Sequence, residues 1–353
     1  MAATGPAVSV IIPLFQKEET VERAIRSVLS QTVQDFEIVV VNDGSTDDGP
    51  EVVRRIGDPR IRLLHQSNQG VSAARNRGIA EARAELIAFL DADDEWLPGF
   101  LEAVLRLEEK YPQAGVFATN YYFCDGEGRY SLPRIRGLPK PPWDGILQDY
   151  FAVAARSDPP LWTSAVCVRK KAIQSVGGFP TGVASGEDLL TWARLAVRGQ
   201  VAYSSAPCAI FRRPQLGWDS KPRIPDVPDV VGGELRRLRS QATAKGVSSV
   251  NQYIALWHRM RATSYLALGR RRAAFREVLL AAQAGGWTLR LVTFCSFAVL
   301  PASLGCRLMN AAWLFLRWVR AVTVRRTQES NDSKAAPECV SAVSAARSSG
   351  VSR

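Results

Sequence analysis

A cluster of carboxylates directly after a short apolar run carries the clearest chemistry in the chain. Leu86 to Leu90 are all apolar, and a run of this length is typical of a buried strand. Asp91, Asp93 and Asp94 follow within four positions, where like charges repel one another. A hard cation such as Mg²⁺ or Mn²⁺, bound beside a substrate phosphate, would relieve that repulsion. The alternative is a solvated acidic turn without a ligand.

Carboxylates also lie at the ends of two other predicted elements. Asp43 comes just after the apolar segment 36–41, so in a parallel sheet it would lie at the same edge as the acidic cluster. Its alternative role is to cap the helix that follows. Glu187 and Asp188 open an amphipathic helix predicted over 187–195, where the alternative role of their charges is to stabilise the helix dipole.

The elements that must position these side chains follow from hydrophobic periodicity. Strands are predicted over 8–12, 36–41, 61–65, 86–90, 115–119 and 162–168, and helices over 20–30, 49–56, 71–84, 96–111 and 146–153. Strands and helices that alternate at this spacing predict an α/β fold with a mostly parallel sheet flanked by helices. The sequence after the first strand is not GxGxxG, and GxxxxGK[ST] occurs nowhere, so a dinucleotide-binding or P-loop protein is excluded.

Composition narrows the class of protein further. The six cysteines form no CxxC pair, which argues against a zinc cage or a disulfide framework and fits a reducing compartment. The net charge of +11 requires anionic neighbours, such as phosphorylated substrates, an anionic membrane surface or nucleic acid. The N-terminus runs into a strand without a charged leader or an apolar h-region, so we expect no signal peptide.

Four segments in this order and spacing resemble the family 2 glycosyltransferases, which are inverting enzymes with the GT-A fold that use nucleotide sugars. They are VSVIIPLFQKEETVERAIRSVLSQT, FEIVVVNDGSTDD, NQGVSAARNRGI and LIAFLDADDEWLPGFL. The resemblance covers about residues 7–215, and four linked motifs are far more specific than one DxD pair. It implies a GT-A domain over 7–220.

The resemblance also implies roles for the residues at the nucleotide end of the site. Asp43 matches a residue that contacts the base, and Asp91 and Asp93 match a DxD pair in which Asp93 binds Mn²⁺ or Mg²⁺ and Asp91 lies nearer the ribose. The remaining nucleotide-sugar-binding positions that we predict are Pro13, Leu14, Phe15, Arg75 and Arg212. For Arg75 the alternative is a solvated helix face.

The segment GGF…GEDLLTWARL is similar to the acceptor segment of the family. The match assigns the general base to Asp188, with Glu187 as the supporting carboxylate. The base takes the proton of the acceptor hydroxyl during an attack that inverts the anomeric carbon. The chain departs from the pattern at Pro214, where many relatives have a metal-binding or diphosphate-binding histidine, so Arg212 or Arg213 would neutralise the diphosphate instead.

The C-terminal part has a different composition, rich in Ala, Arg and Leu. We predict a helical region over 231–322 that contains an antiparallel hairpin, followed by a disordered tail over 327–353. The stretch Leu291–Gly305 is uncharged but too short to span a bilayer, and flanking arginines favour a helix on an anionic membrane surface. An ordinary packed helix pair is the alternative.

We therefore predict a glycosyltransferase that moves a sugar from a nucleotide-diphosphate donor, a UDP-sugar, to a hydroxyl of a glycan or lipid-linked acceptor. It would take part in the synthesis of a polysaccharide, glycolipid or glycoprotein. We expect it in the cytoplasm, bound peripherally at the inner face of the plasma membrane, and we expect no nucleic-acid partner. A nucleotidyltransferase is one alternative, but Pro13–Gln16 is not the basic phosphate-binding loop that it needs. A non-catalytic nucleotide-sugar-binding protein is the other.

Overall fold

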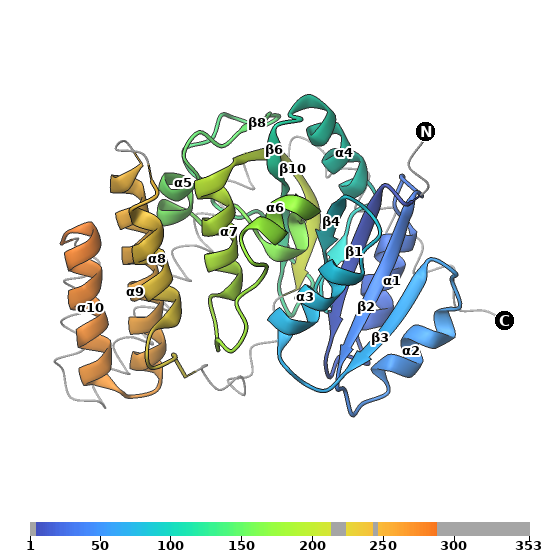
Figure 1. Ribbon diagram of the computed structural model, residues 1–353, viewed down its shortest axis with the longest axis horizontal. Coiled ribbons are helices and arrows are strands. Elements are labelled where there is room, and N and C mark those ends of the chain that lie inside the picture. The colour runs from blue at the N-terminus through green and yellow to red at the C-terminus, as the bar shows by residue number, and fades with distance from the viewer. Residues whose placement is uncertain (1–4, 213–223, 243–245, 288–353) are drawn as a thin grey trace. The chain divides into compact units, whose positions relative to one another are not determined.

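A central mixed sheet with helices packed around it forms the core of the fold (Figure 1). In this computed structural model the described residues are 5–212, 224–242 and 246–287. All of them belong to one compact unit, Met1–Leu291. Pro214, the predicted membrane-surface helix beyond Trp287 and the predicted tail lie outside the described residues.

The strand order is β3-β2-β1-β4-β9-β6-β10-β5, with β7 beside β6 and β8 beside β10. The strands are β1 (Val8–Leu14), β2 (Phe36–Asp43), β3 (Ile61–Gln66), β4 (Leu86–Phe89), β5 (Glu95–Trp96), β6 (Ala114–Cys124), β7 (Tyr130–Ser131), β8 (Asp144–Ile146), β9 (Val166–Arg169) and β10 (Gln200–Arg212). The first four strands pair in parallel, as predicted. Beyond β4 the sheet is mixed, because β9 runs antiparallel to both of its neighbours.

Helices cover both faces of the sheet (Figure 1). They are α1 (Val21–Leu29), α2 (Gly49–Ile56), α3 (Val71–Glu81), α4 (Phe100–Lys110), α5 (Tyr150–Arg156), α6 (Lys170–Ser175) and α7 (Glu187–Arg198), with a 3₁₀ turn, η1, over Thr163–Ala165. Alternate residues of each strand enter different cores: Val10 and Ile12 join the core beneath α1 and α4, whereas Ile11 joins the core beneath α3 and α7. Burial on both faces explains the nearly continuous apolar runs of β1, β2 and β4.

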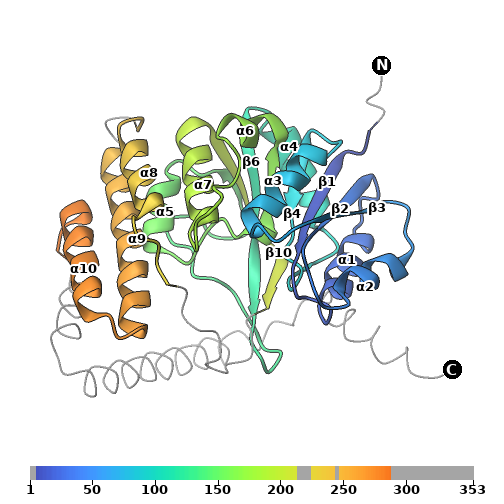
Figure 2. The same ribbon diagram turned by 60° about the horizontal axis from the view of Figure 1, so that its bottom comes forward.

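Three further helices complete the described chain: α8 (Val230–Arg239), α9 (Val247–Ala267) and α10 (Arg271–Gly285). Helix α9 packs on α5, α8 and α10, and α8 packs on α7. In both views α10 lies on the outer side of α9, away from the sheet (Figures 1 and 2). This arrangement confirms the predicted α/β domain with a helical region after it. Within 5–212, 224–242 and 246–287, none of the helices has both the length and the apolar composition needed to cross a membrane.

Several stretches differ from the predicted elements, among them the helix predicted over 146–153, which is α5 at Tyr150–Arg156. The helix predicted from residue 96 begins at Phe100, because Glu95 and Trp96 form β5 and pair with β10. The strand predicted over 162–168 begins with the turn η1 and becomes β9 only at Val166. β1 continues through Pro13 to Leu14, which a strand tolerates here because β4 pairs only with the part of β1 that ends at Ile11.

Candidate active site

The acidic cluster lies directly after β4, as predicted, but its members have different surroundings. Asp94 is buried, and its carboxylate accepts hydrogen bonds from Ser164 Oγ (2.6 Å), Trp162 Nε1 (3.1 Å) and the Arg212 backbone N–H (3.2 Å). Burial, together with the charge of Asp91, raises the pKa of Asp94 to about 8. Asp94 therefore ties the cluster to η1 and β10, and its two neighbours are left for a ligand.

Asp91 forms a close ion pair with a buried arginine. Its Oδ1 lies 2.6 Å from Nη2 of Arg75, which comes from α3 and is only 4% exposed. Burial opposes the charge of Arg75, but the nearby carboxylates outweigh it and raise the pKa of the guanidinium. The Asp91 side chain itself is 26% exposed. Arg75 is therefore a buried permanent charge beside a solvent-accessible carboxylate, not the solvated residue of the alternative interpretation.

The same guanidinium reaches the carboxylates at the start of α7. Nη1 of Arg75 lies 3.6 Å from Oε1 of Glu187. Cζ of the same guanidinium lies 5.1 Å from the centre of the Phe179 ring. Phe179 is fixed by a double hydrogen bond of its backbone with the side chain of Asn76, at 2.8 Å in each direction. Nε and Nη1 of Arg75 have no hydrogen-bond partner among the described residues. Both atoms are shielded from solvent, so Arg75 has two unsatisfied buried donors beside the carboxylates.

Asp188 follows Glu187 and is only partly accessible. Its Oδ1 accepts a hydrogen bond from the Leu189 backbone N–H at 2.6 Å. Removal from water and the charge of Glu187 raise the pKa of Asp188 to about 6, although Arg75 acts in the opposite direction. A carboxylate with a pKa near 6 is ionised at pH 7 yet basic enough to accept a proton, which is the property required of a general base.

Asp93 faces the segment after β1. Its Oδ2 lies 2.7 Å from Nζ of Lys17, and both side chains are about 40% exposed. The backbone carbonyl of Asp93 accepts a hydrogen bond from Arg23 on α1 at 3.2 Å. Lys17 was not among the predicted residues, and nothing in its local sequence indicates a partner 76 positions away. An exposed lysine is a weak and displaceable counter-charge.

Asp43 ends β2 and is buried, with three protein donors on its carboxylate. Oδ1 accepts from Gln66 Nε2 (2.8 Å) and the Gln69 N–H (2.9 Å), and Oδ2 accepts from the Gly70 N–H (2.8 Å). Gly70 is the residue before α3, the helix that carries Arg75. Asp43 thus fixes the loop that leads into α3, and one lone pair of its four remains for a ligand.

The segment 13–15 after β1 divides between core and surface. Leu14 is fully buried, so only its backbone could contact a ligand, whereas Phe15 is 45% exposed. Pro13 is partly buried. Gln16 adopts a left-handed conformation, with φ of 52°, and its side-chain oxygen accepts from the backbone N–H of Thr46 at 2.9 Å. The exposed ring of Phe15 is therefore the side chain of this segment that is free to contact a nucleotide base.

Arg212 lies at the end of β10, on the other side of the cluster. It forms an ion pair with Glu95 through Nε, and its Nη1 contacts the Cys124 thiol at 3.3 Å. Burial disfavours its charge, but Glu95 outweighs this effect and raises its pKa. The Glu95 carboxylate also pairs with Arg23 at 2.7 Å. Two arginines, Arg212 and Arg23, thus adjoin the acidic cluster.

The predicted residues therefore fall into two groups, one joined by direct contacts and one that lies apart from it. Direct contacts join Asp91, Arg75 and Glu187, with Asp188 next in the chain. Within the described part of the chain, Asp43, Phe15 and Arg212 form no hydrogen bond or ion pair with that group, although Asp43 holds the start of α3. Sequence analysis missed Lys17 and Ser164, whose roles depend on contacts between distant segments. The arrangement can bind an anion and accept a proton within one site.

The sequence was compared with families and with individual proteins. The model of the family described as Glycosyl transferase family 2 matches residues 9–170. An uncharacterized glycosyltransferase of Rickettsia bellii is 32% identical over 193 residues, which cover 54% of this chain and 26% of that protein. The uncharacterized glycosyltransferase YibD of Escherichia coli is 39% identical over 144 residues, covering 38% and 42%. The chain thus spans less than half the length of these relatives.

Solved structures share the fold at low sequence identity. TarS of S. aureus (residues 1–349), in complex with UDP-GlcNAc, matches with a TM-score of 0.60 and 17% identity, covering 81% of this chain and 83% of that chain. The mannosyltransferase PcManGT of Pyrobaculum calidifontis, in complex with GDP-Man and Mn²⁺, matches with a TM-score of 0.52 and 19% identity, covering 87% and 86%. At these identities the likeness shows the fold alone.

Proposed function

Through residues 9–170 the chain belongs to glycosyl transferase family 2, and we propose that it is an inverting glycosyltransferase. It would transfer a sugar from a nucleotide diphosphate, a UDP-sugar, to a hydroxyl of a glycan or lipid-linked acceptor during polysaccharide, glycolipid or glycoprotein synthesis. The observation that carries the proposal is the buried Arg75, which joins Asp91 after β4 to Glu187 at the start of α7. A transferase needs its donor-binding and base-bearing carboxylates held together in this way.

The donor would lie along the carboxyl ends of β1, β2 and β4. The base would stack on the exposed ring of Phe15, next to Pro13 and Leu14, and donate a hydrogen bond to the free lone pair of Asp43. The positive charges of Arg75 and Arg212 would neutralise the diphosphate. TarS and PcManGT bind UDP-GlcNAc and GDP-Man, which supports a nucleotide sugar as the donor class.

Asp93 and Asp91 are the residues that would hold a divalent cation, Mn²⁺ or Mg²⁺. Each carboxylate contacts a protein cation through one oxygen, which leaves the second oxygen as a hard ligand. Lys17, the partner of Asp93, is exposed enough to move aside. When bound, the cation would neutralise the negative charge that develops on the leaving nucleotide. The donor set therefore fits this group.

Asp188 would remove the proton from the acceptor hydroxyl while the oxygen attacks the anomeric carbon. Attack on the face opposite the nucleotide converts an α-linked donor into a β-linked product. Glu187 supports the base in two ways: its charge raises the pKa of Asp188, and its own carboxylate faces Arg75. The sugar pocket would be formed by the loops around 121–142 and 181–188.

The proposal is tested with a panel of UDP-, GDP-, TDP- and CMP-sugars, each with and without Mn²⁺. Thermal unfolding and donor hydrolysis are measured for the wild type and for Asp93→Ala. We expect one nucleotide sugar to raise the midpoint in a metal-dependent way and the variant to lose that response. Stabilisation without hydrolysis would favour a non-catalytic binding protein, and no stabilisation by any nucleotide sugar would refute the donor site.

We further infer that the protein works in the cytoplasm, at the inner face of the plasma membrane. The support is the net charge of +11 and the outer face of α10, where the exposed arginines Arg272 and Arg276 flank Phe275 and Leu279, 39% and 38% exposed. Co-sedimentation with phosphatidylserine vesicles, absent with phosphatidylcholine and weakened by salt, is the expected result. Equal binding to both lipids, or salt-sensitive retention on DNA instead, would contradict it.

A further inference from the structure

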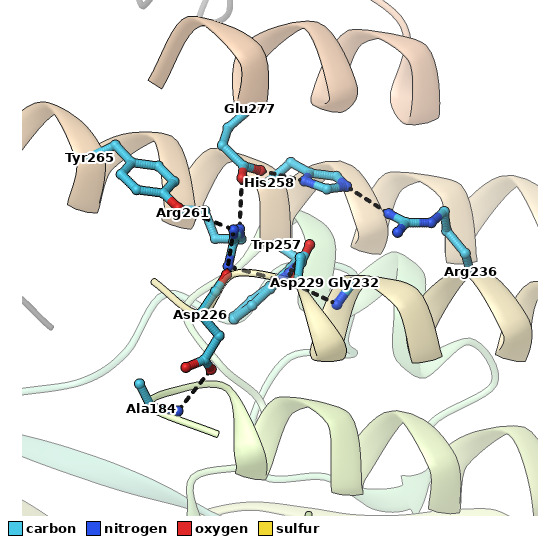
Figure 3. Close-up of polar contacts among 10 residues, drawn as sticks. All are labelled: Ala184, Asp226, Asp229, Gly232, Arg236, Trp257, His258, Arg261, Tyr265 and Glu277. Atoms are coloured by element: carbon cyan, nitrogen blue, oxygen red, sulfur yellow. Dashed lines mark hydrogen bonds and ion pairs between the residues drawn. The ribbon is translucent and has the colours of Figure 1, made fainter. Parts of the chain in front are cut away.

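Helix α9 and the segment before α8 contact the turn that starts α7 at three separate points. The backbone N–H of Ala184 donates to Oδ2 of Asp226 at 2.8 Å (Figure 3). Tyr253 donates its hydroxyl hydrogen to the carbonyl of Leu189 at 3.0 Å. The third contact is the packing of Trp257 on Gly186. Together the three points bracket the two carboxylates that follow Gly186.

The packing of Trp257 on Gly186 leaves no space for a side chain. A Cβ at Gly186 would lie 2.5 Å from Cζ3 of the indole, and Gly186 also has a φ of +82°. Both conditions require glycine at this position. The indole is itself fixed, because its Nε1 donates to both carboxylate oxygens of Asp229, at 3.1 and 3.3 Å. Trp257 therefore sets how closely the turn approaches α9.

Arg261 does not contact the turn itself but binds the residues that do or that hold Trp257 (Figure 3). Its Nη2 donates to the carbonyl of Asp226 at 3.1 Å, and its Nη1 lies 3.5 Å from Oδ1 of Asp229. Its Nε donates to Oε1 of Glu277 on α10 at 2.8 Å. The side chain is 5% exposed, so its charge depends on these partners. One arginine thus connects α10 with both aspartates that hold the turn.

The geometry of this network does not favour a metal ion, although Asp229, His258 and Glu277 lie within metal-binding reach of one another. Both oxygens of Glu277 accept protein donors, from Arg261 and from Nδ1 of His258 at 2.7 Å. Nε2 of His258 faces Nη1 of Arg236 at 3.4 Å and acts as the acceptor there. The cationic Arg261 occupies the place between the carboxylates, so the network serves packing and orientation.

We propose that Tyr253, Trp257 and Arg261 are positioning residues for Glu187 and Asp188, an inference that rests on the proposed function. Asp188 has one hydrogen bond of its own among the described residues, to the adjacent Leu189 N–H, so its direction follows that of the turn. The three contacts hold the turn on both sides of this residue. A helical region outside the matched family segment thereby aims the base at the acceptor.

Hydrogen exchange measured by mass spectrometry tests this directly, without a known acceptor. Tyr253→Phe removes the contact with Leu189, and Asp226→Ala removes the contact with Ala184. Tyr150→Phe is the matched control, because the hydroxyl of Tyr150 contacts that of Tyr253 at 3.1 Å and, among the described residues, forms no hydrogen bond with 184–189. We expect exchange in peptides covering 184–195 to rise about fivefold in each test variant, the effect of one lost hydrogen bond. Unchanged exchange, or an equal rise in the control, would overturn the proposal.

Activity separates failure of this inference from failure of the proposed function. The donor selected by the panel is hydrolysed by the wild type, Tyr253→Phe, Tyr150→Phe and Asp188→Asn. We expect Tyr253→Phe to lower kcat at unchanged donor KM, with Tyr150→Phe near wild type. An unchanged kcat in Tyr253→Phe beside a reduced kcat in Asp188→Asn refutes the positioning role alone. An unchanged kcat in Asp188→Asn refutes the base assignment on which it rests.

Discussion

Replacement of Arg75 by methionine removes the one charge that joins the two halves of the site. Methionine has a similar length and fills the space beside Phe179, so the change deletes charge rather than packing. Asp91 and Glu187 would then face each other without a buried cation between them. Asp188 would also lose the interaction that opposes the rise in its pKa.

The size of the effect follows from the burial of the pair. Loss of one partner of a buried ion pair costs about 3–5 kcal/mol, because the other charge stays behind uncompensated. Arg75 is 4% exposed, but Asp91 is 26% exposed and can regain water. We therefore expect a loss near the lower limit, about 3 kcal/mol in the free energy of unfolding at pH 7.5. The loss should shrink towards pH 5, because Asp188, whose pKa burial and Glu187 raise to about 6, is then protonated and no longer repels its neighbours.

Urea unfolding of the wild type, Arg75→Met and Arg75→Lys at both pH values measures this loss. The lysine variant keeps a charge but not the fork that reaches two carboxylates, so its stability should lie between the other two. The acid limb of donor hydrolysis in Arg75→Met should also move to higher pH. An Arg75→Met protein as stable as the wild type at pH 7.5, or with the same loss at both pH values, would refute this reasoning.

Three further predictions concern neighbouring charges. Glu187→Gln should move the acid limb of the pH–rate profile to lower pH, because the Glu187 charge raises the pKa of Asp188; an unmoved limb in hydrolysis assays would count against the pair. Lys17→Met should tighten Mn²⁺ binding to Asp93 by at most about fivefold, because an exposed ion pair contributes no more free energy than that. Electron paramagnetic resonance of free Mn²⁺ measures the affinity, and weaker binding would contradict this prediction. Burial alone would raise the pKa of Glu277, but hydrogen bonds from His258 and Arg261 lower it below 4.5. The contribution of Glu277 to stability is therefore present above pH 4.5 and is lost as the pH falls through the folded-state pKa. The urea midpoint of Glu277→Gln should accordingly depend less on pH between about 6 and 3 than that of the wild type.

The first four strands and their helices could be predicted because local pattern and burial agree there. The run 86–90 is apolar at every position, since β4 has a covered face on each side, and it ends in the polar cluster at the sheet edge. Helix α1 shows the same agreement, with its buried residues on one face. The hydrophobic pattern also placed Asp43 near the end of a strand and Glu187 at the start of a helix, where the structure has them.

β10 could not be predicted, because its sequence contradicts its structure locally. Its middle reads Ser204-Ser-Ala-Pro207, a composition typical of a loop, and the pairing with β6 shifts register on both sides of Pro207. Long-range pairing on both edges of the strand outweighs the local preference. The short strand β5, which depends on β10 for its partner, was missed for the same reason.

The site shows the same division between local pattern and distant contacts. Sequence analysis identified Asp91, Asp93 and Asp188 by type and position. It could not distinguish the buried Asp94 from its neighbours, because that depends on Ser164 and Trp162, about 70 positions later. The link from Arg75 to Glu187 depends equally on tertiary packing, as do the contacts of α9 with the start of α7. These contacts give each carboxylate its own surroundings, which the local sequence does not show.

The most direct test of the central claim is the anomeric form of the first sugar released. The wild type is mixed with its α-linked nucleotide sugar and Mn²⁺, and the products are followed by proton NMR from the start of the reaction. We predict that the β anomer appears first and that Asp188→Asn, folded and still able to bind the donor, releases almost none. Release of the α anomer, or equal release by the variant, would contradict an inverting transferase with Asp188 as its base.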